Sequence, residues 1–427
     1  MQVFLKNFGC SANIADGEVL AGCLAQAGFQ IVASESEANV LIYNTCAVKG
    51  PTENRIIDAI KHAPKNKKII VAGCLPKISF ERLLREVPFD GAVGPSVGGE
   101  IVDVVNRVAA GEKVLDLSEL YKMPKLNLPK IRSNPVVSVV PISYGCLGSC
   151  AYCCVVHARG HLRSYSVKEV VERVSCDIAE GAREFWVTSQ DTACYGKDFH
   201  ANLSVLLKAL DGVAGDFKIR VGMMTPNMVT DMQKELIDAF KSDKIFKFLH
   251  LPVQSGDDET LNRMHRFYTA AEFKALVNAF RAQFPDLTLA TDIIVGFPGE
   301  TEDAFENTLK LLEDVKPDVT NVSKFFARPK TTAAQIREGL VERDEIKRRS
   351  ARAAQLARRV SLEQNKRWIG WVGEVLVDEK GKVEGSWVGR NFAYKPVVVK
   401  SAHNLLAKTI KVKVELTTDT YLKGTIG

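Results

Sequence analysis

The stretch VVSVVPISYGCLGSCAYCCVVHARG, residues 136–160, joins a strand pattern to a dense group of cysteines. Residues 136–143 are mostly apolar, which predicts a strand buried on both faces of a parallel sheet. Cys146, Cys150 and Cys153 follow with a C-x3-C-x2-C spacing, on a segment that we expect to be a loop. Active groups of a βα barrel lie at the carboxyl ends of its strands, so the stretch predicts a barrel with a cysteine site at its mouth.

The spacing of these cysteines limits the kinds of site they can form. Three thiolates so close together are either neutralised by a metal or reprotonated. A structural zinc site takes four ligands, and His157 is the nearby candidate for the fourth. With three ligands only, a 4Fe-4S cluster keeps one iron open to a substrate or cofactor. Cys154 follows Cys153 directly, and we expect its side chain to point away from the other thiols.

The region that follows repeats a strand and helix pattern. About six βα units fit an open or partial barrel better than a closed barrel of eight. The predicted strands are residues 136–143, 185–190, 219–226, 248–254, 289–297 and 319–327. The predicted helices are residues 166–182, 227–242, 269–284 and 301–315.

The first ~115 residues also alternate strands and helices, which is typical of an α/β domain with a parallel sheet. The predicted strands 2–9, 39–45 and 67–73 are followed directly by Cys10, Cys46 and Cys74. Because the carboxyl ends of parallel strands lie along one edge of the sheet, the three cysteines are expected to converge. A metal site is the favoured interpretation, and the alternative is that each cysteine is a small buried hydrophobe.

The remaining segments complete a prediction of domains 1–115, 116–135, 136–365 and 366–427. Residues 116–135 carry Pro124, Pro129 and Pro135 without periodicity and are interpreted as a linker. After a charged helix at 342–360, short alternating strands with glycine-rich turns predict a small β-barrel. The strands of this terminal barrel are expected at residues 371–379, 383–390, 394–400 and 408–416.

Charge is unevenly distributed along the 427 residues. From Lys324 to Gly427 there are 22 Lys and Arg against 11 Asp and Glu, whereas the rest of the chain has 35 against 40. This pattern suits either a polyanionic partner or a solvated helix face. No apolar run approaches the roughly 20 residues of a membrane helix, and the amino terminus has no signal-peptide pattern. We therefore expect a cytoplasmic protein with no membrane partner, whose ten cysteines are not a disulfide framework.

The cysteine loop carries a family resemblance. Its spacing, with Tyr152 just before the last cysteine, resembles the motif of the radical S-adenosylmethionine (SAM) superfamily. The resemblance implies a catalytic 4Fe-4S cluster on Cys146, Cys150 and Cys153 that binds SAM and generates a 5′-deoxyadenosyl radical.

The resemblance extends to one family and covers almost the whole chain. FGCSANIADGE, NTCAVKG and VAGCLPK are similar to the amino-terminal segments of methylthiotransferases, which implies a second 4Fe-4S cluster on Cys10, Cys46 and Cys74. TSQDT, RVGMMTP, LHLPVQSG and TDIIVGFPGET resemble the segments of that family that line the cofactor pocket. The cofactor contacts implied by these segments and by the cysteine loop are Tyr152, Gln190, Asp191, Arg220 and Gln254. Cys23, Cys154, Cys176 and Cys194 are expected not to bind iron, Cys23 and Cys176 because helical periodicity makes them packing residues.

HARG at 157–160, continued by HLRSYS, resembles the archaeal and eukaryotic branch of the family, which acts on N6-threonylcarbamoyladenosine beside the anticodon. That branch usually has lysine where this chain has Cys154. The implied partners are a tRNA anticodon stem-loop and an electron donor such as a ferredoxin or flavodoxin, with the sulfur donor unassigned. The segment GRNFAYKPVVV resembles the TRAM type of RNA-binding barrel, so removal of residues from Trp368 onward should weaken RNA binding and leave cofactor cleavage intact.

Three alternatives remain open at this point. Two are methylthiotransferases of another substrate, either isopentenyladenosine in tRNA or an aspartate of a ribosomal protein. The third is a zinc-dependent RNA-binding protein without catalysis. The basic carboxyl-terminal end and the HARG segment favour RNA over a protein substrate.

Overall fold

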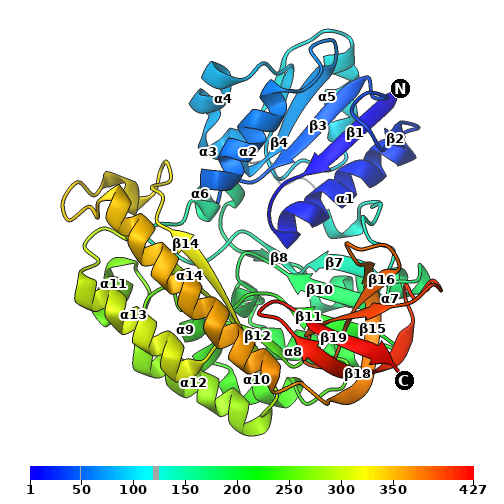
Figure 1. The fold of residues 1–427 in the computed structure, drawn as a ribbon. Coiled ribbons are helices and arrows are strands. Elements are labelled where there is room, and N and C mark those ends of the chain that lie inside the picture. Colours follow the sequence, from blue (N-terminus) through cyan, green and yellow to red (C-terminus); the bar gives the residue numbers. More distant parts are fainter. Residues whose placement is uncertain (49, 119–124) are drawn as a thin grey trace.

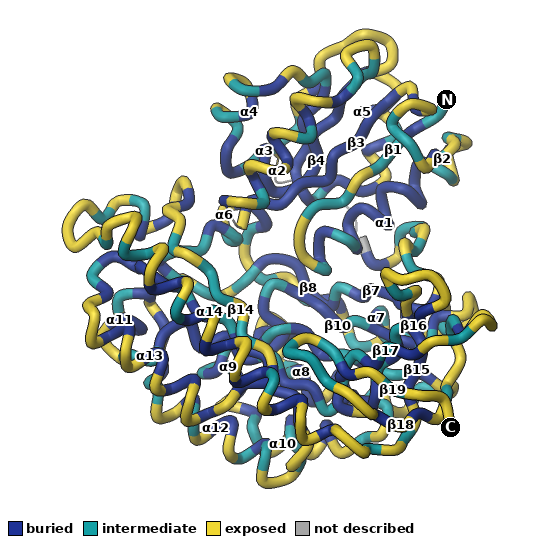
Figure 2. The backbone as a smooth tube through the Cα atoms, viewed as in Figure 1, coloured by how far each residue is buried: buried dark blue, intermediate teal, exposed yellow. Residues whose placement is uncertain are grey.

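The structure, a computed structural model, describes residues 1–48, 50–118 and 125–427. Pro124 and part of the predicted linker lie outside the described residues. Figure 1 shows an amino-terminal sheet with its helices, a central barrel below it, and a small carboxyl-terminal barrel packed against the central one. In Figure 2 the strands form the buried interior, and the outer sides of the helices are exposed.

The amino-terminal sheet has six parallel strands in the order β2-β1-β3-β4-β5-β6. The three strands predicted before the cysteines are present, and β3 is buried along its whole length. The other three are only three residues long, too short for a clear sequence pattern. The strands are β1 (Gln2–Asn7), β2 (Gln30–Val32), β3 (Val40–Thr45), β4 (Lys68–Gly73), β5 (Gly91–Val93) and β6 (Val114–Asp116).

Helices cover both faces of this sheet. One apolar cluster joins the sheet to α1 and α5, and includes Cys23 as expected. A second cluster joins the opposite face to α2, α3 and α4. The helices are α1 (Ser11–Gln26), α2 (Gly50–Lys61), α3 (Cys74–Ile78), α4 (Phe80–Glu86) and α5 (Ile101–Ala109).

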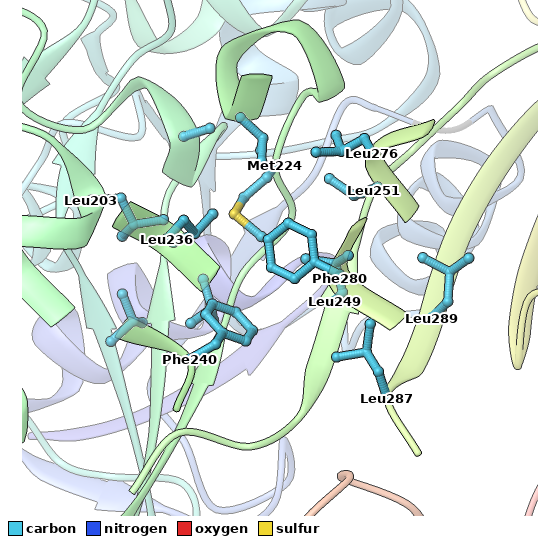
Figure 3. Packing of buried hydrophobic residues seen from close by; sticks show 14 of the residues in the cluster. Leu203, Met224, Leu236, Phe240, Leu249, Leu251, Leu276, Phe280, Leu287 and Leu289 are labelled. Carbon is cyan, nitrogen blue, oxygen red and sulfur yellow. The ribbon is translucent and has the colours of Figure 1, made fainter. Parts of the chain in front are cut away.

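The central region is an open barrel of six parallel strands, as predicted. Its strands form two sheets, β11-β10-β7 and β12-β13-β14. Figure 3 shows the core between strands and helices, where Phe280 and Phe240 pack with Leu249 and Leu289. The strands are β7 (Val137–Pro141), β10 (Glu184–Thr188), β11 (Lys218–Val221), β12 (Phe248–His250), β13 (Thr288–Val295) and β14 (Val319–Lys324). The larger helices are α7 (Val167–Ala179), α8 (Leu203–Asp211), α12 (Ala270–Gln283), α13 (Glu302–Val315) and α14 (Arg343–Lys366).

Two helix predictions for this region were wrong in detail. The helix expected over 227–242 is divided into α9 (Pro226–Thr230) and α10 (Gln233–Ala239), because Met232 leaves helical geometry and its side chain enters the core. Cys176 on α7 is exposed and does not pack in the core. The buried neighbouring position is occupied by Asp177, whose carboxylate is paired with Lys130 at 2.6 Å, so apolar periodicity alone misplaced the helix face.

The terminal region is a closed five-stranded barrel in the order β15-β16-β17-β19-β18. Inward-facing valines on alternate positions, such as Val375 and Val377, form its core. The last strand was not predicted, and it closes the barrel by pairing with both β17 and β18. The strands are β15 (Val372–Lys380), β16 (Ser386–Arg390), β17 (Pro396–Lys400), β18 (Thr409–Thr417) and β19 (Leu422–Ile426).

The terminal barrel closes the amino-terminal end of the central one. The Tyr394 hydroxyl donates to the Glu184 carboxylate at 3.2 Å, where β10 begins. The buried Lys395 ammonium lies 2.8 Å from Asp318, just before β14. Glu184 and Asp318 belong to the central barrel, whereas Tyr394 and Lys395 belong to the terminal barrel. The two barrels therefore form one packed body, and the terminal barrel is not a freely separable appendage.

The described end of the predicted linker also packs between regions. The Ile131 backbone N–H donates to the Glu18 carbonyl of α1 at 2.9 Å, and Ser133 donates to the Glu18 carboxylate. Lys130 reaches the other way, to Asp177 on α7. This segment therefore ties the amino-terminal sheet region to the central barrel.

Candidate active site with two groups of cysteines

The first group of cysteines lies on the loop between β8 (Ser143–Tyr144) and α6 (Val155–Arg159), at the carboxyl end of the central barrel strands. The Gly148 backbone N–H donates to Cys146 Sγ at 3.1 Å. A Cβ at Gly148 would lie 3.2 Å from Cys146 Sγ and 3.7 Å from Cys150 Sγ. Two sulfurs of the loop thus lie close to the Gly148 peptide, and the absence of a side chain at glycine permits this close approach.

Arg266 is the main polar neighbour of this loop, and the sequence reasoning did not identify it. Its Nη1 donates to Cys150 Sγ at 3.3 Å. Its remaining donors are fixed by the Tyr268 hydroxyl at 3.0 Å and the Pro252 carbonyl at 3.1 Å. The side chain is 6% exposed, so a buried cation faces the thiols of the loop.

Cys194 touches the same group from the other side. It lies in η2 (Thr192–Cys194), and its thiol donates to Asp191 Oδ2 at 3.4 Å. The neighbouring Cys194 thiol also interacts with Cys146, and a hydrogen bond between the two lowers the pKa of the Cys146 thiol. Cys194 therefore contacts a proposed ligand, although the sequence assigned it no role.

The second group of cysteines lies where three neighbouring strands of the amino-terminal sheet end. Cys10 follows β1, Cys46 follows β3 and Cys74 follows β4. The register of these strands places Asn7 beside Asn44 and Thr45 beside Gly73, so the three cysteines lie at the same edge of the sheet. A Cβ at Gly9 would lie 2.4 Å from Cys46 Cβ, which shows how closely the segment before Cys10 approaches Cys46.

The three thiols of this second group interact electrostatically. Burial, together with the neighbouring Cys10 and Cys74, raises the pKa of Cys46 to about 12, and burial also raises the pKa of Cys74. The protonated forms of Cys46 and Cys74 are therefore favoured unless a positive charge or a metal compensates for the burial. The predicted convergence of the three strand-end cysteines is what the structure shows.

Arg159, the arginine of the HARG segment, reaches this second group from the central region. Its guanidinium pairs with Asp16 at 2.5 Å and lies 5.1 Å from the centroid of the Tyr144 ring, and its charge and hydrogen bonding lower the pKa of the Cys74 thiol against the effect of burial. The side chain is 3% exposed. The HARG arginine is thus part of the interior between the two regions and cannot contact RNA directly.

Cys154, which directly follows the loop group in the chain, packs beside the second group. Its thiol donates to the carbonyl of Ala47 at 3.5 Å, and its side chain packs in the same apolar cluster as Cys74. The prediction that it points away from the loop cysteines is confirmed. The residue after Cys153 therefore contacts the residue after Cys46.

The implied cofactor contacts fall into different environments. Asp191 accepts backbone hydrogen bonds from Ala193 and Thr225, both at 3.1 Å, and so holds two strand-end loops together. The Gln190 side-chain oxygen is buried and has no hydrogen-bond partner within the described chain. Gln254 lies four residues after the end of β12, has a left-handed backbone conformation with φ of 71°, and is 7% exposed.

Tyr152 and Arg220 lie at different depths. Tyr152 packs against Ala151, Met264 and Phe297 beside the cysteine loop. Arg220 lies within β11, and its guanidinium is 5.0 Å from the Phe248 ring and 5.4 Å from the Tyr394 ring. Its ring contacts are thus at the base of the barrel, which the terminal barrel closes.

A further polar group inside the barrel was missed. His250 Nε2 lies 3.2 Å from Asp292 Oδ2, and Asn321 donates to Asp292 Oδ1 at 2.6 Å. These residues stand on β12, β13 and β14. Polar residues on alternate positions of otherwise apolar strands were the signal that could have identified them.

The arrangement of side chains bears on the kind of metal site. In residues 1–48, 50–118 and 125–427, no group of three His, Cys, Asp or Glu side chains is arranged to hold a single metal ion. His157, the proposed fourth zinc ligand, is exposed on α6. A zinc ion needs its ligands around one point, whereas a cubane binds each thiolate at a different iron. The loop offers three thiols with a peptide N–H and a buried guanidinium beside them, a donor set that a 4Fe-4S cluster can use.

Searched over the described residues, the structure has no helix that is both long and apolar enough to cross a membrane.

Three family models match the chain. They describe the radical SAM superfamily, over residues 140–312, the uncharacterized protein family UPF0004, over residues 2–94, and the TRAM domain, over residues 366–426. The first match includes the cysteine loop, and the second includes the three strand-end cysteines.

Similar curated proteins match over the whole chain. The chain is 39% identical over 431 residues to a probable threonylcarbamoyladenosine tRNA methylthiotransferase of Pyrococcus horikoshii, covering 100% of this chain and 99% of the relative. It is 35% identical over 436 residues to the threonylcarbamoyladenosine tRNA methylthiotransferase of Xenopus laevis, covering 99% of this chain and 76% of the relative. Among solved structures, the radical S-adenosylmethionine methyltransferase TsrM from Kitasatospora setae aligns with a TM-score of 0.56 at 13% identity, over 78% of this chain and 76% of that one. The last likeness concerns the fold alone.

Proposed function

The chain belongs to the radical SAM family of threonylcarbamoyladenosine tRNA methylthiotransferases, and on that premise we propose that it converts N6-threonylcarbamoyladenosine beside the anticodon into its 2-methylthio derivative. The observation that carries the proposal is the meeting of two three-cysteine groups, one on a barrel loop and one at a sheet edge, through Cys154 and Arg159. A reaction that combines radical formation with sulfur transfer needs two such sites close together.

We assign the loop cysteines Cys146, Cys150 and Cys153 to a 4Fe-4S cluster that binds SAM. When bound there, the cluster and SAM would supply the radical chemistry that activates C2 of the adenine. The chain supports this assignment with the close-fitting Gly148 peptide and the Arg266 cation beside the thiols. Hydrogen-bond donors of this kind favour thiolates over thiols.

We assign Cys10, Cys46 and Cys74 to a second 4Fe-4S cluster, which would hold the sulfur to be transferred. The convergence of these thiols, the hydrogen bond from Arg159 to Cys74 and the match of residues 2–94 to one family support the assignment. We propose domains at 1–115, 116–135, 136–365 and 366–427, so that each cluster has a domain of its own.

Within the central barrel we propose Tyr152, Gln190, Asp191, Arg220 and Gln254 as cofactor or active-site contacts. The buried acceptor of Gln190 supports its role, because a buried oxygen without a donor is costly and the ammonium group of SAM would satisfy it. Asp191 is proposed to act by fixing the two loops that border this pocket. Arg220 is the least directly supported, since its ring contacts are at the barrel base.

The substrate is proposed to be the anticodon stem-loop of tRNA, bound partly by the terminal barrel. Unstacked bases of single-stranded loops can enter an enzyme pocket at a cost of a few kcal/mol. The basic carboxyl-terminal end and the TRAM match support this partner. A ferredoxin or flavodoxin in the cytoplasm is the proposed electron donor, and the sulfur donor is left unassigned.

The test is nucleoside mass spectrometry of tRNA after reaction with the anaerobically reconstituted protein, SAM and a reductant. We expect a nucleoside that carries both the threonylcarbamoyl and the methylthio group. Protein with Cys146, Cys150 and Cys153 replaced by alanine is the matched control and should give none. Methylthiolation of isopentenyladenosine, or of a ribosomal protein offered in the same reaction, would contradict the substrate assignment.

A further inference from the structure

Each group of cysteines has one buried arginine beside it, and both arginines come from the central region of the chain. Arg266 donates to Cys150 in the loop group at 3.3 Å. Arg159, whose guanidinium pairs with Asp16 at 2.5 Å, lies beside Cys74 in the strand-end group and lowers the pKa of its thiol by its charge. Both side chains are buried, Arg266 at 6% and Arg159 at 3% exposure, so water does not screen their charges as it would at the surface.

The two arginines differ in their other partners. Besides the thiol, Arg266 contacts only neutral groups among its hydrogen-bond partners in the described chain, the Tyr268 hydroxyl and the Pro252 carbonyl. Arg159 is paired with the Asp16 carboxylate, which also accepts from the Tyr144 hydroxyl at 3.1 Å. The loop group therefore faces the Arg266 cation at Cys150 and the Asp191 carboxylate near Cys146, whereas the Arg159 charge beside the strand-end group is paired directly with Asp16.

This difference matters for any cluster held by the thiols. Reduction by one electron adds one negative charge to a cluster and leaves its atoms unchanged. A nearby cation or hydrogen-bond donor stabilises that charge, more strongly in a buried site than in water. Hydrogen bonds to cluster sulfurs are one of the means by which proteins set reduction potentials.

We propose that Arg159 and Arg266 are positioning residues that set the reduction potentials of the two clusters separately, Arg266 for the loop cluster and Arg159, attenuated by Asp16, for the strand-end cluster. This inference rests on the proposed two-cluster function. Each arginine would act through the one cysteine that it faces, Cys150 for Arg266 and Cys74 for Arg159. The loop cluster, which must pass its electron to SAM, and the sulfur-carrying cluster thereby receive different electrostatic surroundings from one fold.

The experiment isolates each cluster in the full-length protein. Replacing Cys146, Cys150 and Cys153 by alanine leaves the strand-end cluster alone, and replacing Cys10, Cys46 and Cys74 leaves the loop cluster alone. Arg159→Gln and Arg266→Gln are introduced into both backgrounds. Each protein is reconstituted anaerobically and titrated with dithionite in the presence of redox mediators, and the reduced cluster is measured by electron paramagnetic resonance.

The expected result is a crossed pattern. R159Q should move the midpoint of the strand-end cluster to a more negative potential and leave the loop cluster unchanged, and R266Q should do the reverse. We expect at least a tenfold change in the ratio of reduced to oxidised cluster at fixed potential, about 59 mV for a one-electron couple. Arg→Lys at each position should restore part of the shift, because the charge remains and the planar fork of donors is lost.

Asp16→Asn gives a test of opposite sign, which remains decisive if R159Q loses its cluster. Asn at this position removes one negative charge beside Arg159 and the strand-end group, so the strand-end midpoint should move to a more positive potential. Unchanged midpoints in proteins with full iron content, or equal shifts of both clusters by one arginine, would overturn the inference. Absence of iron from the strand-end background without any arginine substitution would instead refute the proposed second cluster.

Discussion

Each of the two groups contains three cysteines, but the chain brings them together in different ways. Cys146, Cys150 and Cys153 belong to one loop of eight residues, so covalent connection alone keeps them close. The strand-end group is spread over more than 60 residues of chain, from Cys10 through Cys46 to Cys74. These cysteines meet only because β1, β3 and β4 are neighbours in a parallel sheet. The first group is therefore a property of the local sequence, and the second is a property of topology.

The groups also differ in their exposure. All three loop cysteines are partly exposed at the barrel mouth, whereas Cys46 and Cys74 are buried at 6% and 8% exposure and only Cys10 of the strand-end group is exposed. An accessible loop suits the binding of a cofactor from solution. A more enclosed site suits a cluster that retains its sulfur between steps.

The largest expected effect separates the two groups by function. Replacing the three loop cysteines by alanine should abolish cleavage of SAM to 5′-deoxyadenosine, measured by chromatography. Replacing the three strand-end cysteines should leave that cleavage measurable and abolish methylthio transfer. Iron content should fall by roughly half in either variant, since each cubane depends on its own thiolates.

Cys23→Ala and Cys176→Ser are the matched cysteine controls for this experiment, and both should retain their iron. A strand-end variant that keeps all its iron, or still makes product, would show that the second group is only a packing feature. Only the loop group would then be a metal site.

The second expected effect concerns the contact between the terminal barrel and the central barrel. Deletion of residues from Trp368 onward should destabilise the central barrel, because it removes the contacts of Tyr394 and Lys395 with Glu184 and Asp318 and exposes the barrel base that the terminal barrel covers. Each lost hydrogen bond costs about 0.5–1.5 kcal/mol, and the newly exposed apolar surface adds to this cost. Thermal unfolding of the truncated protein should begin well below that of the full chain.

Replacement of exposed Lys411, Lys413 and Lys423 by alanine is the cleaner test of RNA binding, because these side chains lie on strands of the terminal barrel and leave the docking contacts intact. Each lost phosphate contact should reduce the slope of log K against log salt by about 0.7–0.9. A truncated protein as stable as the full chain would show that the terminal barrel is a separable module.

The third effect is a pH dependence at the base of the barrel, away from both cysteine groups. Burial raises the pKa of Glu184 from 4.5 to about 7, with Asp378 adding to the shift. A carboxyl whose pKa is raised on folding contributes stability below its unfolded pKa, and this contribution is lost as pH rises through the folded value. The free energy of unfolding should therefore decline between about pH 5 and 7, by about 3 kcal/mol at most.

Glu184→Gln should flatten this dependence, as measured by urea unfolding at several pH values. Because neither cysteine group contacts Glu184 in the hydrogen bonds and ion pairs of the described chain, the iron content of Glu184→Gln should equal that of the unsubstituted protein. An unchanged pH profile in this variant would assign the dependence to other groups.

The smallest effect sharpens the comparison within the loop group. Cys194→Ala removes one hydrogen bond to Cys146, a contribution of about 0.5–1.5 kcal/mol. Iron should be retained, and SAM cleavage should fall by no more than about tenfold. Equal activity of Cys194→Ala and the exposed Cys176→Ser would show that the contact with Cys146 has no consequence.

The sequence by itself determined the six cysteines, the six central strands and the small terminal barrel. Apolar runs and alternation report burial within a strand, and the parallel-sheet rule then places strand ends at one edge. The rule succeeded for Cys46 and Cys74 because it needs only the order of strands. Helical periodicity failed for Cys176, because the ion-paired Asp177 occupies the buried position next to it.

Only the tertiary structure decided which side chains surround those cysteines. Arg159 lies 143 positions from Asp16 in sequence, and Arg266 lies 116 from Cys150. Nothing in local spacing or periodicity specifies such pairs, because they depend on how whole regions pack against one another. The docking of Tyr394 and Lys395 at the barrel base is of the same kind, a match of shape and charge between surfaces that exist only once both barrels are folded.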